Sequence, residues 1–192
     1  KTVPSRNLEF YLDPESIDCY YGGSHHDGVQ HNKAYNISDT TSNKYGTMHN
    51  GTTYVFDGSN DWIEYTDWVH PSSCTVMMWI STSTNSRTFC SNSSGGPVST
   101  VYKTDGNGYL SFDYYDGSWR TVSAGTPVAT DGNWQHIAFA RSGTNHKFYV
   151  NAGLVGDTTM NSSMQGTVDT VGGDWSGRYH SGYLGDFRVY NE

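Results

Sequence analysis

Hydrophobic and polar side chains alternate most clearly along residues 134–141. Successive side chains of an extended strand point to opposite faces, so Trp134 and His136 would share one face while Ile137 and Phe139 share the other. A helix would need a period of about 3.6 residues, which this stretch does not show. The pattern therefore predicts a β-strand.

Two turn signals connect neighbouring runs of this kind. Ser-Gly-Thr-Asn at 142–145 separates the strand at 134–141 from a second alternating run at 146–151, so we expect a hairpin with a four-residue loop. Asp116 and Gly117 lie between two aromatic runs, where Asp-Gly is typical of a type I′ hairpin turn. Both signals favour antiparallel pairing between strands that follow one another in the chain.

The alternation recurs along the chain, and Gly, Asn, Asp and Ser interrupt it about every ten residues, a spacing typical of a β-sandwich. We therefore predict an all-β fold, built as a two-sheet antiparallel sandwich. The predicted strands are 7–12, 53–56, 62–65, 74–81, 87–91, 98–103, 108–115, 119–124, 134–141, 146–151, 167–172 and 182–190. The expected core residues include Val76, Met78, Ile137, Phe139, Phe148, Val150, Phe187 and Val189.

The run at 74–80 is apolar on both faces, with Val76 and Met78 on one face and Met77 and Trp79 on the other. Strands that are covered on both sides have such apolar runs, because neither face is exposed to water. We therefore expect a central strand with both of its faces buried.

Residues 14–50 follow no period and are predicted to form a long loop. Connections of this length are uncommon inside compact domains and are often functional, or held by a metal ion or a partner. The loop contains His25, His26 and His31, but vicinal histidine side chains usually diverge, and no Cys or matching His completes a tetrahedral set. We therefore do not expect a zinc site.

Length and composition favour one domain, since a sandwich of 192 residues routinely forms a single unit. Only 34% of the residues are hydrophobic, but 15% are aromatic, and large rings bury enough area for a core. The chain starts at Lys1 without a methionine and ends directly after a predicted strand. We expect residues 1–192 to form one domain, and its excision from a larger protein stays an open alternative.

The net charge of −8 argues against nucleic acid as a partner, because binding phosphates needs clustered Lys and Arg. No stretch approaches the roughly 20 apolar residues of a membrane span. No charged-then-apolar signal segment precedes the first predicted strand. We expect no nucleic-acid partner and no membrane insertion.

Three cysteines, Cys19, Cys74 and Cys90, permit at most one internal disulfide. If residues 74–80 and 87–91 form a hairpin, Cys90 lies opposite Met78 and some way from Cys74. We therefore expect buried free thiols.

Several stretches together resemble a known family. They are Leu-Glu-Phe-Tyr-Leu-Asp at 8–13, the Gly-Thr-Met and Asn-Gly segments within 39–51, Phe-Asp-Gly-Ser-Asn-Asp-Trp-Ile at 56–63 and Gly-Asp-Phe-Arg-Val-Tyr-Asn at 185–191. The chain resembles, over essentially its whole length, a LamG-like (laminin G-like) domain of the concanavalin A-like lectin/glucanase superfamily, which implies a jelly roll. Thr-Thr-Ser at 40–42 and Ala-Gly at 152–153 depart from the family pattern, which affects loop conformation rather than the fold.

The resemblance also implies a structural Ca²⁺ ion where the first strand, the loop before the second and the last strand converge. The matching positions in this sequence are Asp13, Asp57, Gly58 and Asp186. Carboxylate and carbonyl oxygens suit Ca²⁺ better than Zn²⁺. The alternative is that Asp57 and Gly58 only form a turn and that Asp186 only solvates a sheet edge.

The superfamily contains glycosidases, which use two carboxylates about 5 to 10 Å apart, in related folds commonly Glu pairs on one strand. Glu occurs only at positions 9, 15, 64 and 192, so no such pair exists. Asp113 and Asp116 would face opposite sides of a strand. We therefore do not expect an enzyme.

Exposed aromatic rings favour recognition instead. The Gly-rich stretch 172–182 offers its rings little core to enter, whereas Trp79 and Trp134 have strand patterns that lead into a core. Aromatic faces stack on the apolar faces of sugars, and polar neighbours bond the hydroxyls. The predicted ligand-binding residues are Asp174, Trp175, Tyr179 and His180, with Tyr115 and Trp119 as a second candidate patch.

We therefore predict a non-catalytic, lectin-like recognition module that binds a glycan or surface glycoconjugate in adhesion. The resemblance implies an extracellular setting, on a cell surface or a virion surface. The alternative is a structural or decoration module whose aromatic loops contact protein subunits of a larger assembly.

Overall fold

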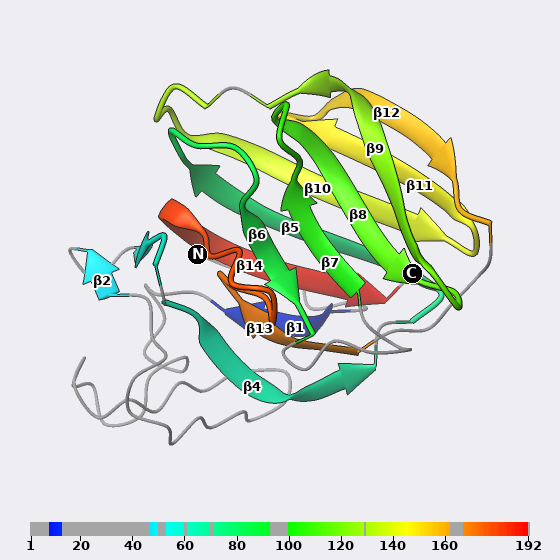
Figure 1. The fold of residues 1–192 in the computed structure, drawn as a ribbon, viewed down its shortest axis with the longest axis horizontal. Helices are drawn as coiled ribbons and strands as arrows, with labels where there is room; N and C mark the ends of the chain where they lie inside the picture. Colours follow the sequence, from blue (N-terminus) through cyan, green and yellow to red (C-terminus); the bar gives the residue numbers. More distant parts are fainter. Residues whose placement is uncertain are drawn as a thin grey trace.

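Two antiparallel β-sheets face each other in the computed structural model and enclose a core between them (Figure 1). The structure describes residues 8–12, 47–49, 53–59, 61–69, 71–92, 100–128, 130–161 and 167–191. These ranges contain no helix, and hence none long and apolar enough to cross a membrane. The predicted all-β, two-sheet sandwich is confirmed.

One sheet has eight strands, in the order β12-β11-β10-β5-β14-β3-β2, with β1 also paired to β14. β14 lies next to β5 on one side, while on the other side its first half pairs with β3 and its second half with β1. The strands are β1 Leu8–Leu12, β2 Thr47–His49, β3 Thr53–Asp57, β5 Ser73–Ser81, β10 Gln135–Ser142, β11 Asn145–Val150, β12 Gly153–Thr159 and β14 Ser181–Asn191.

The other sheet has six strands, in the order β4-β13-β6-β7-β8-β9. The strands are β4 Ile63–Val69, β6 Thr88–Ser91, β7 Thr100–Thr104, β8 Tyr109–Tyr115, β9 Trp119–Pro127 and β13 Thr167–Val171. Residues 172–180 connect β13 of this sheet to β14 of the other, so the Gly-rich loop crosses from one layer to the next.

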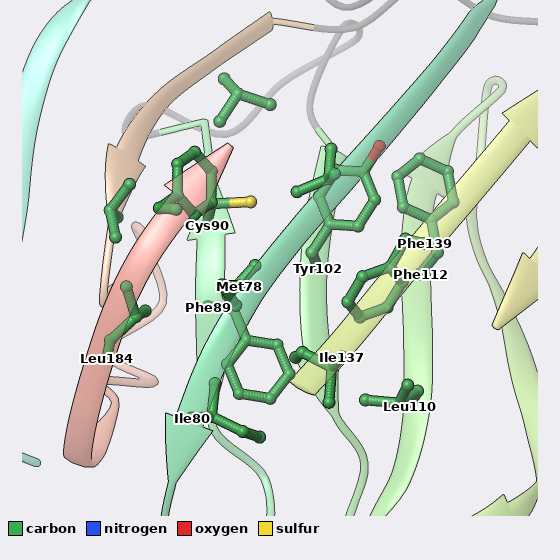
Figure 2. Close-up of a cluster of buried hydrophobic side chains, with 14 of the residues drawn as sticks. Met78, Ile80, Phe89, Cys90, Tyr102, Leu110, Phe112, Ile137, Phe139 and Leu184 are labelled. Atoms are coloured by element: carbon green, nitrogen blue, oxygen red, sulfur yellow. The ribbon is translucent and has the colours of Figure 1, made fainter. Parts of the chain in front are cut away.

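Side chains from both sheets meet in the core (Figure 2). The ring of Tyr102 on β7 lies 4.7 Å from Phe112 of the same sheet and 5.0 Å from Phe139 of the opposite sheet. Tilted and edge-on contacts of this kind are the favourable geometry for aromatic rings. Of the eight core residues expected from the alternation, seven are buried, and Val150 is partly buried against the same core.

Each of the twelve predicted strands overlaps an observed strand, but β2 and β12 are absent from the prediction. β2 lies within the stretch predicted to be a loop. β12 is an edge strand of the eight-stranded sheet, with mostly exposed side chains and two glycines, so it lacks the alternation that marks a half-buried strand. An added Cβ at Gly156 would lie 2.6 Å from the Cα of Ala124, which shows how closely β12 approaches β9 there.

The expected hairpin between 74–80 and 87–91 is wrong. β5 pairs with β10 and β14 in one sheet, whereas β6 pairs with β7 and β13 in the other, so the chain changes sheets after Ser81. Cys74 and Cys90 are nevertheless buried thiols that are not joined in a disulfide, as expected. Burial raises the pKa of Cys90 well above its ordinary value, which keeps it protonated. Cys19 lies outside the described residues.

The hairpins on either side of β11 have two-residue loops. Ser142 pairs directly with Asn145, so the loop is 143–144 and is shorter than the four residues expected. Between β11 and β12, Asn151 and Ala152 have φ values of 49° and 67°. Positive φ at both central residues is the requirement of a type I′ turn, which here contains an alanine.

Candidate functional site

Aromatic residues from the two predicted patches meet on the outer face of the six-stranded sheet. Trp119 begins β9 and Trp175 lies in the 172–180 loop, yet their rings stack, with centroids 5.8 Å apart and planes inclined by 28°. Tyr115 of β8 contacts Trp119 edge-on at 5.7 Å. Trp119 and Trp175 remain 41% and 46% exposed. We call Tyr115, Trp119 and Trp175 the aromatic platform.

The β8–β9 hairpin presents two members of this platform. Tyr114 is buried in the core, so its neighbour Tyr115 and the paired residue Trp119 point to the outer face. The pairing leaves a three-residue loop, 116–118, in which only Gly117 has a positive φ, of 105°. A type I′ turn needs positive φ at two central residues, so the predicted turn type is wrong although the hairpin itself exists.

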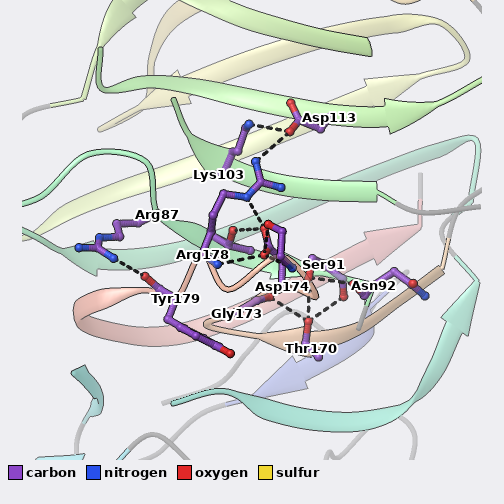
Figure 3. Close-up of polar contacts among 12 residues, drawn as sticks. Arg87, Ser91, Asn92, Lys103, Asp113, Thr170, Gly173, Asp174, Arg178 and Tyr179 are labelled. Carbon is purple, nitrogen blue, oxygen red and sulfur yellow. Dashed lines mark hydrogen bonds and ion pairs between the residues drawn. The ribbon is translucent and has the colours of Figure 1, made fainter. Parts of the chain in front are cut away.

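Asp174 organises the loop that presents Trp175 (Figure 3). Its Oδ1 accepts hydrogen bonds from the backbone N–H of Ser176 at 2.8 Å, from the Ser176 hydroxyl at 2.7 Å and from the N–H of Arg178 at 3.1 Å. Its Oδ2 accepts from the Thr88 hydroxyl at 3.0 Å and from Arg178 Nε at 2.6 Å. Because its carboxylate is fully buried, Asp174 shapes the loop and is not accessible to a ligand, contrary to expectation.

Asp113 ties the same loop to the sheet (Figure 3). Its carboxylate lies 2.5 Å from Lys103 Nζ and 3.4 Å from Arg178 Nη1, and it accepts a hydrogen bond from the Thr121 hydroxyl at 2.8 Å. With Asp174, this network contains two carboxylates and two cations, so its charges balance. Satisfied polar networks of this kind make a structure rigid.

His180 lies in the core, contrary to the expectation that it bonds a ligand at the surface. Its buried ring packs between Phe56 and Phe89, at 5.6 and 5.7 Å. Burial is the main reason that the pKa of His180 is lowered to about 4; a hydrogen bond to the Tyr183 carbonyl opposes this shift, and the charge of Arg87 adds to it. Nε2 lies 3.2 Å from the Tyr183 carbonyl oxygen, which can only accept, so Nε2 carries the proton of a neutral imidazole.

Tyr179 belongs to a different aromatic pair. Its partly buried ring stacks on Trp62 at 5.6 Å with an interplanar angle of 17°. Its carbonyl oxygen accepts a hydrogen bond from Arg87 at 3.1 Å. Of the six residues predicted to bind a ligand, the structure therefore brings three together as the aromatic platform.

The structure does not bring Asp57 and Asp186 together, although both are predicted calcium ligands. Asp57 pairs with Ser181, five residues before Asp186 on β14, which corresponds to roughly 16 Å along a strand. Gly58 follows Asp57 with a φ of 82° and lies at that same distant end. Both carboxylate oxygens of Asp186 accept hydrogen bonds from Arg188, at 2.8 and 2.6 Å, and this cation disfavours a metal ion there.

Asp13, the remaining predicted calcium ligand, lies outside the described residues. Within the described ranges, no group of three or more His, Cys, Asp or Glu side chains is arranged to hold a metal ion. Calcium binding stays a prediction, and thermal unfolding in the presence of Ca²⁺ and of a chelator tests it.

Two tryptophans with strand patterns that lead into a core are exposed instead. Trp79 and Trp134 are 40% and 44% exposed on the outer face of the eight-stranded sheet. β5 is therefore buried on one side only, and the prediction of a strand covered on both sides is wrong. Alternation separates the two faces of a strand, but it does not reveal whether a second layer covers an apolar face.

A family model described as the concanavalin A-like lectin/glucanases superfamily matches residues 57–192, which is more than half of the chain. The comparison with curated proteins finds no match.

Several solved structures share the fold. Domain 4 of AbnA, a GH43 extracellular arabinanase from Geobacillus stearothermophilus, in complex with arabinotriose, has a TM-score of 0.72 at 16% identity, covering 96% of this chain and 92% of that chain. The CBM40 of Ruminococcus gnavus IT-sialidase, bound to α2,3 sialyllactose, has a TM-score of 0.50 at 14% identity, covering 64% and 78%. Botulinum neurotoxin type C, whose cell entry depends on two ganglioside molecules, has a TM-score of 0.54 at 11% identity, covering 84% and 46%.

Proposed function

Because the chain belongs to the concanavalin A-like lectin/glucanases superfamily, we propose that it is a non-catalytic carbohydrate-binding module. Its sugar-binding surface is the aromatic platform. One observation carries this proposal: Trp119 and Trp175, from distant parts of the chain, are held ring against ring and stay nearly half exposed. Exposed indole faces are the surface on which the apolar face of a sugar ring stacks.

The platform is preorganised for such a ligand. Trp175 is held by a loop whose Asp174 accepts five hydrogen bonds, and Trp119 is held by the register of the β8–β9 hairpin. A site whose side chains are already ordered loses little conformational entropy when a ligand binds. Arg178, which belongs to the same loop and is partly exposed, offers guanidinium N–H groups to sugar hydroxyls.

The carboxylates beneath the platform support binding rather than hydrolysis. Glycoside hydrolysis needs two carboxyl groups that reach opposite sides of the scissile bond. Asp113 is occupied by Lys103, Arg178 and Thr121, and the carboxylate of Asp174 is buried. Both groups are therefore better suited to holding the loop than to reacting with a sugar.

The structural relatives support the same function, since they include a domain in complex with arabinotriose and a module bound to sialyllactose. We place the module outside a cell, on a cell or virion surface, where many copies can engage many glycans. Weak single sites then combine, because linked binding events raise the overall affinity by about 10² to 10⁴.

A glycan array probed with a multimerised form of the protein tests the proposal. We expect binding to at least one glycan, and Trp119→Ala and Trp175→Ala should each weaken it at least about tenfold. The melting temperature should change little in either variant, because an exposed ring contributes little to the core.

Two further variants act as controls. Trp119→Phe keeps a smaller aromatic face and should retain part of the affinity. Leu154→Ala removes an exposed apolar side chain, 55% exposed on β12 of the other sheet, and should leave sugar binding unchanged. Absence of all glycan binding by the wild-type protein, or undiminished binding by both Trp→Ala variants, would reject the platform as the sugar site.

A further inference from the structure

A second group of aromatic side chains covers part of the outer face of the eight-stranded sheet. Trp79 of β5 pairs with His136 of β10, and their rings meet edge-on 5.3 Å apart. Trp134 precedes β10, and its ring lies 6.0 Å from that of Tyr183 on β14. The strands β10, β5 and β14 are neighbours in this sheet (Figure 1). We call Trp79, Trp134, His136 and Tyr183 the sheet-face cluster.

Small residues separate the large rings of this cluster. Tyr183 pairs with Ser81, and Trp79 pairs with Gly185. No long side chain therefore rises from these two positions to cover the neighbouring rings. Trp79 and Trp134 remain 40% and 44% exposed as a result.

Polar groups accompany the rings. His136 interacts electrostatically with both Asp186 and Arg188. Partial burial lowers the pKa of His136 below its ordinary value, Asp186 opposes this shift and Arg188 adds to it, so the imidazole is neutral near pH 7. A neutral imidazole offers one N–H donor and one acceptor nitrogen. Asp186 and Arg188 form a bidentate ion pair whose charges cancel.

The backbone of β14 is distorted at the same place. A β-bulge interrupts its register between Gly185 and Arg188, and Asp186 within the bulge has a φ of 52°. This left-handed conformation is unfavourable for a residue with a Cβ. Bulges and strained residues concentrate at binding sites, where they re-aim a side chain. Here the bulge directs the Asp186 carboxylate to Arg188, beside the cluster.

From these observations we infer that the sheet-face cluster is a second ligand site, which takes a neutral saccharide on the side of the sandwich opposite the aromatic platform. The ring faces of Trp79 and Trp134 take the apolar face of a sugar. His136 and the Asp186–Arg188 pair bond its hydroxyls, which both donate and accept hydrogen bonds. The cluster and the platform share no residue, so this site goes beyond the proposed function.

Chemical-shift titrations with lactose, arabinotriose and α2,3 sialyllactose test the inference. The Trp119→Ala/Trp175→Ala double variant removes the platform and isolates the second face. We expect lactose or arabinotriose to shift backbone resonances of β5, β10 and β14 in this variant, and sialyllactose to bind more weakly than lactose. Adding Trp79→Ala should weaken the remaining binding at least tenfold, and Trp134→Ala serves as a second probe should Trp79→Ala unfold. Adding Leu154→Ala, on the same sheet but outside the cluster, should leave it unchanged.

The outcomes separate this site from the platform. Loss of all saccharide binding in the double variant, with binding retained by the wild-type protein, overturns the second site and leaves the proposed function standing. Binding that survives the double variant and disappears with Trp79→Ala supports the second site, whatever the fate of the platform. Self-association of the protein that Trp79→Ala abolishes, without any saccharide shifts on this face, also overturns the inference, because the face then binds a second copy.

Discussion

His180 makes the stability of the fold depend on pH. The folded protein holds its imidazole neutral with a pKa of about 4, whereas the unfolded chain has the ordinary value of 6.5. Between pH 6.5 and about 4, the unfolded state therefore binds a proton that the folded state does not. The stabilisation that this group contributes is complete above pH 6.5 and decreases as the pH falls through this window.

We expect the free energy of unfolding to fall by up to about 3 kcal/mol between pH 6.5 and 4 because of this residue. Urea unfolding at several pH values measures it, and His180→Gln, which cannot titrate, should flatten the curve. His136→Gln, a half-buried histidine on the sheet face, should retain most of the slope. An unchanged slope in His180→Gln would show that other groups cause the pH dependence.

Gly182 is a position that only glycine fits. Its φ is +127°, and an added Cβ would overlap the carbonyl oxygen of Ser81, which is backbone of the neighbouring strand β5. Gly132 also has a positive φ, of +81°, but nothing lies within 4 Å of a Cβ added there. Substituting Gly132 and Gly182 separately therefore distinguishes the effect of backbone conformation on stability from that of close packing.

Gly132→Ala should lower the free energy of unfolding by about 1 kcal/mol, since only the left-handed conformation opposes it. Gly182→Ala should lower it by more than about 3 kcal/mol, because strands β5 and β14 must also move apart. Chemical unfolding measures both values. Equal losses in the two variants would contradict the close contact between the strands.

At the scale of elements, the turn of the β11–β12 hairpin contains a residue that does not suit its backbone conformation. Ala152 has a φ of 67°, a conformation that is unfavourable by roughly 1 to 2 kcal/mol for a residue with a Cβ. We expect Ala152→Gly to raise the free energy of unfolding by about 0.5 kcal/mol, since the greater freedom of glycine in the unfolded chain offsets part of the gain. Ala138→Gly, in the middle of β10, should instead lower it by about 1 kcal/mol. Destabilisation by Ala152→Gly would contradict the turn geometry.

Alternation predicts the strands themselves because one face of most of them packs against the core. The same argument explains what it misses: β12 has little buried surface, and its glycines interrupt the pattern. Pairing partners far apart in sequence leave no local signal either. The chain changes sheets between β5 and β6, so the expected neighbours 74–80 and 87–91 belong to different layers.

The candidate site can also be predicted from the sequence only in part. Exposure of Trp119 and Trp175 can be predicted, because a turn and a Gly-rich loop give a ring little core to enter. Their contact cannot, since it depends on how the 172–180 loop crosses the six-stranded sheet. Asp174 and His180 look like surface groups in sequence, yet the fold uses them as the buried anchors of that loop.

At the scale of the whole molecule, charge limits the choice of ligand. The chain carries a net charge of −8, and the cations near the platform are paired: Lys103 with Asp113, Arg120 with Asp116, and Arg178 with Asp113 and Asp174. We expect neutral glycans to bind with affinities that change less than about twofold between 50 and 500 mM NaCl, because no ion pair forms on binding. Titration calorimetry at both salt concentrations measures this. A steep loss of affinity with salt would mean that an anionic glycan is recognised.

The position of β14 also affects how the protein is made. β14 pairs with β5, β3 and β1, so these three strands lack this pairing partner until residues 181–191 have been synthesised. Until then, the growing chain presents unpaired strand edges and an incomplete core, both of which promote aggregation. A ribosome that stalls shortly before this segment would therefore hold a chain that depends on chaperones, although almost all of its sandwich has already been translated.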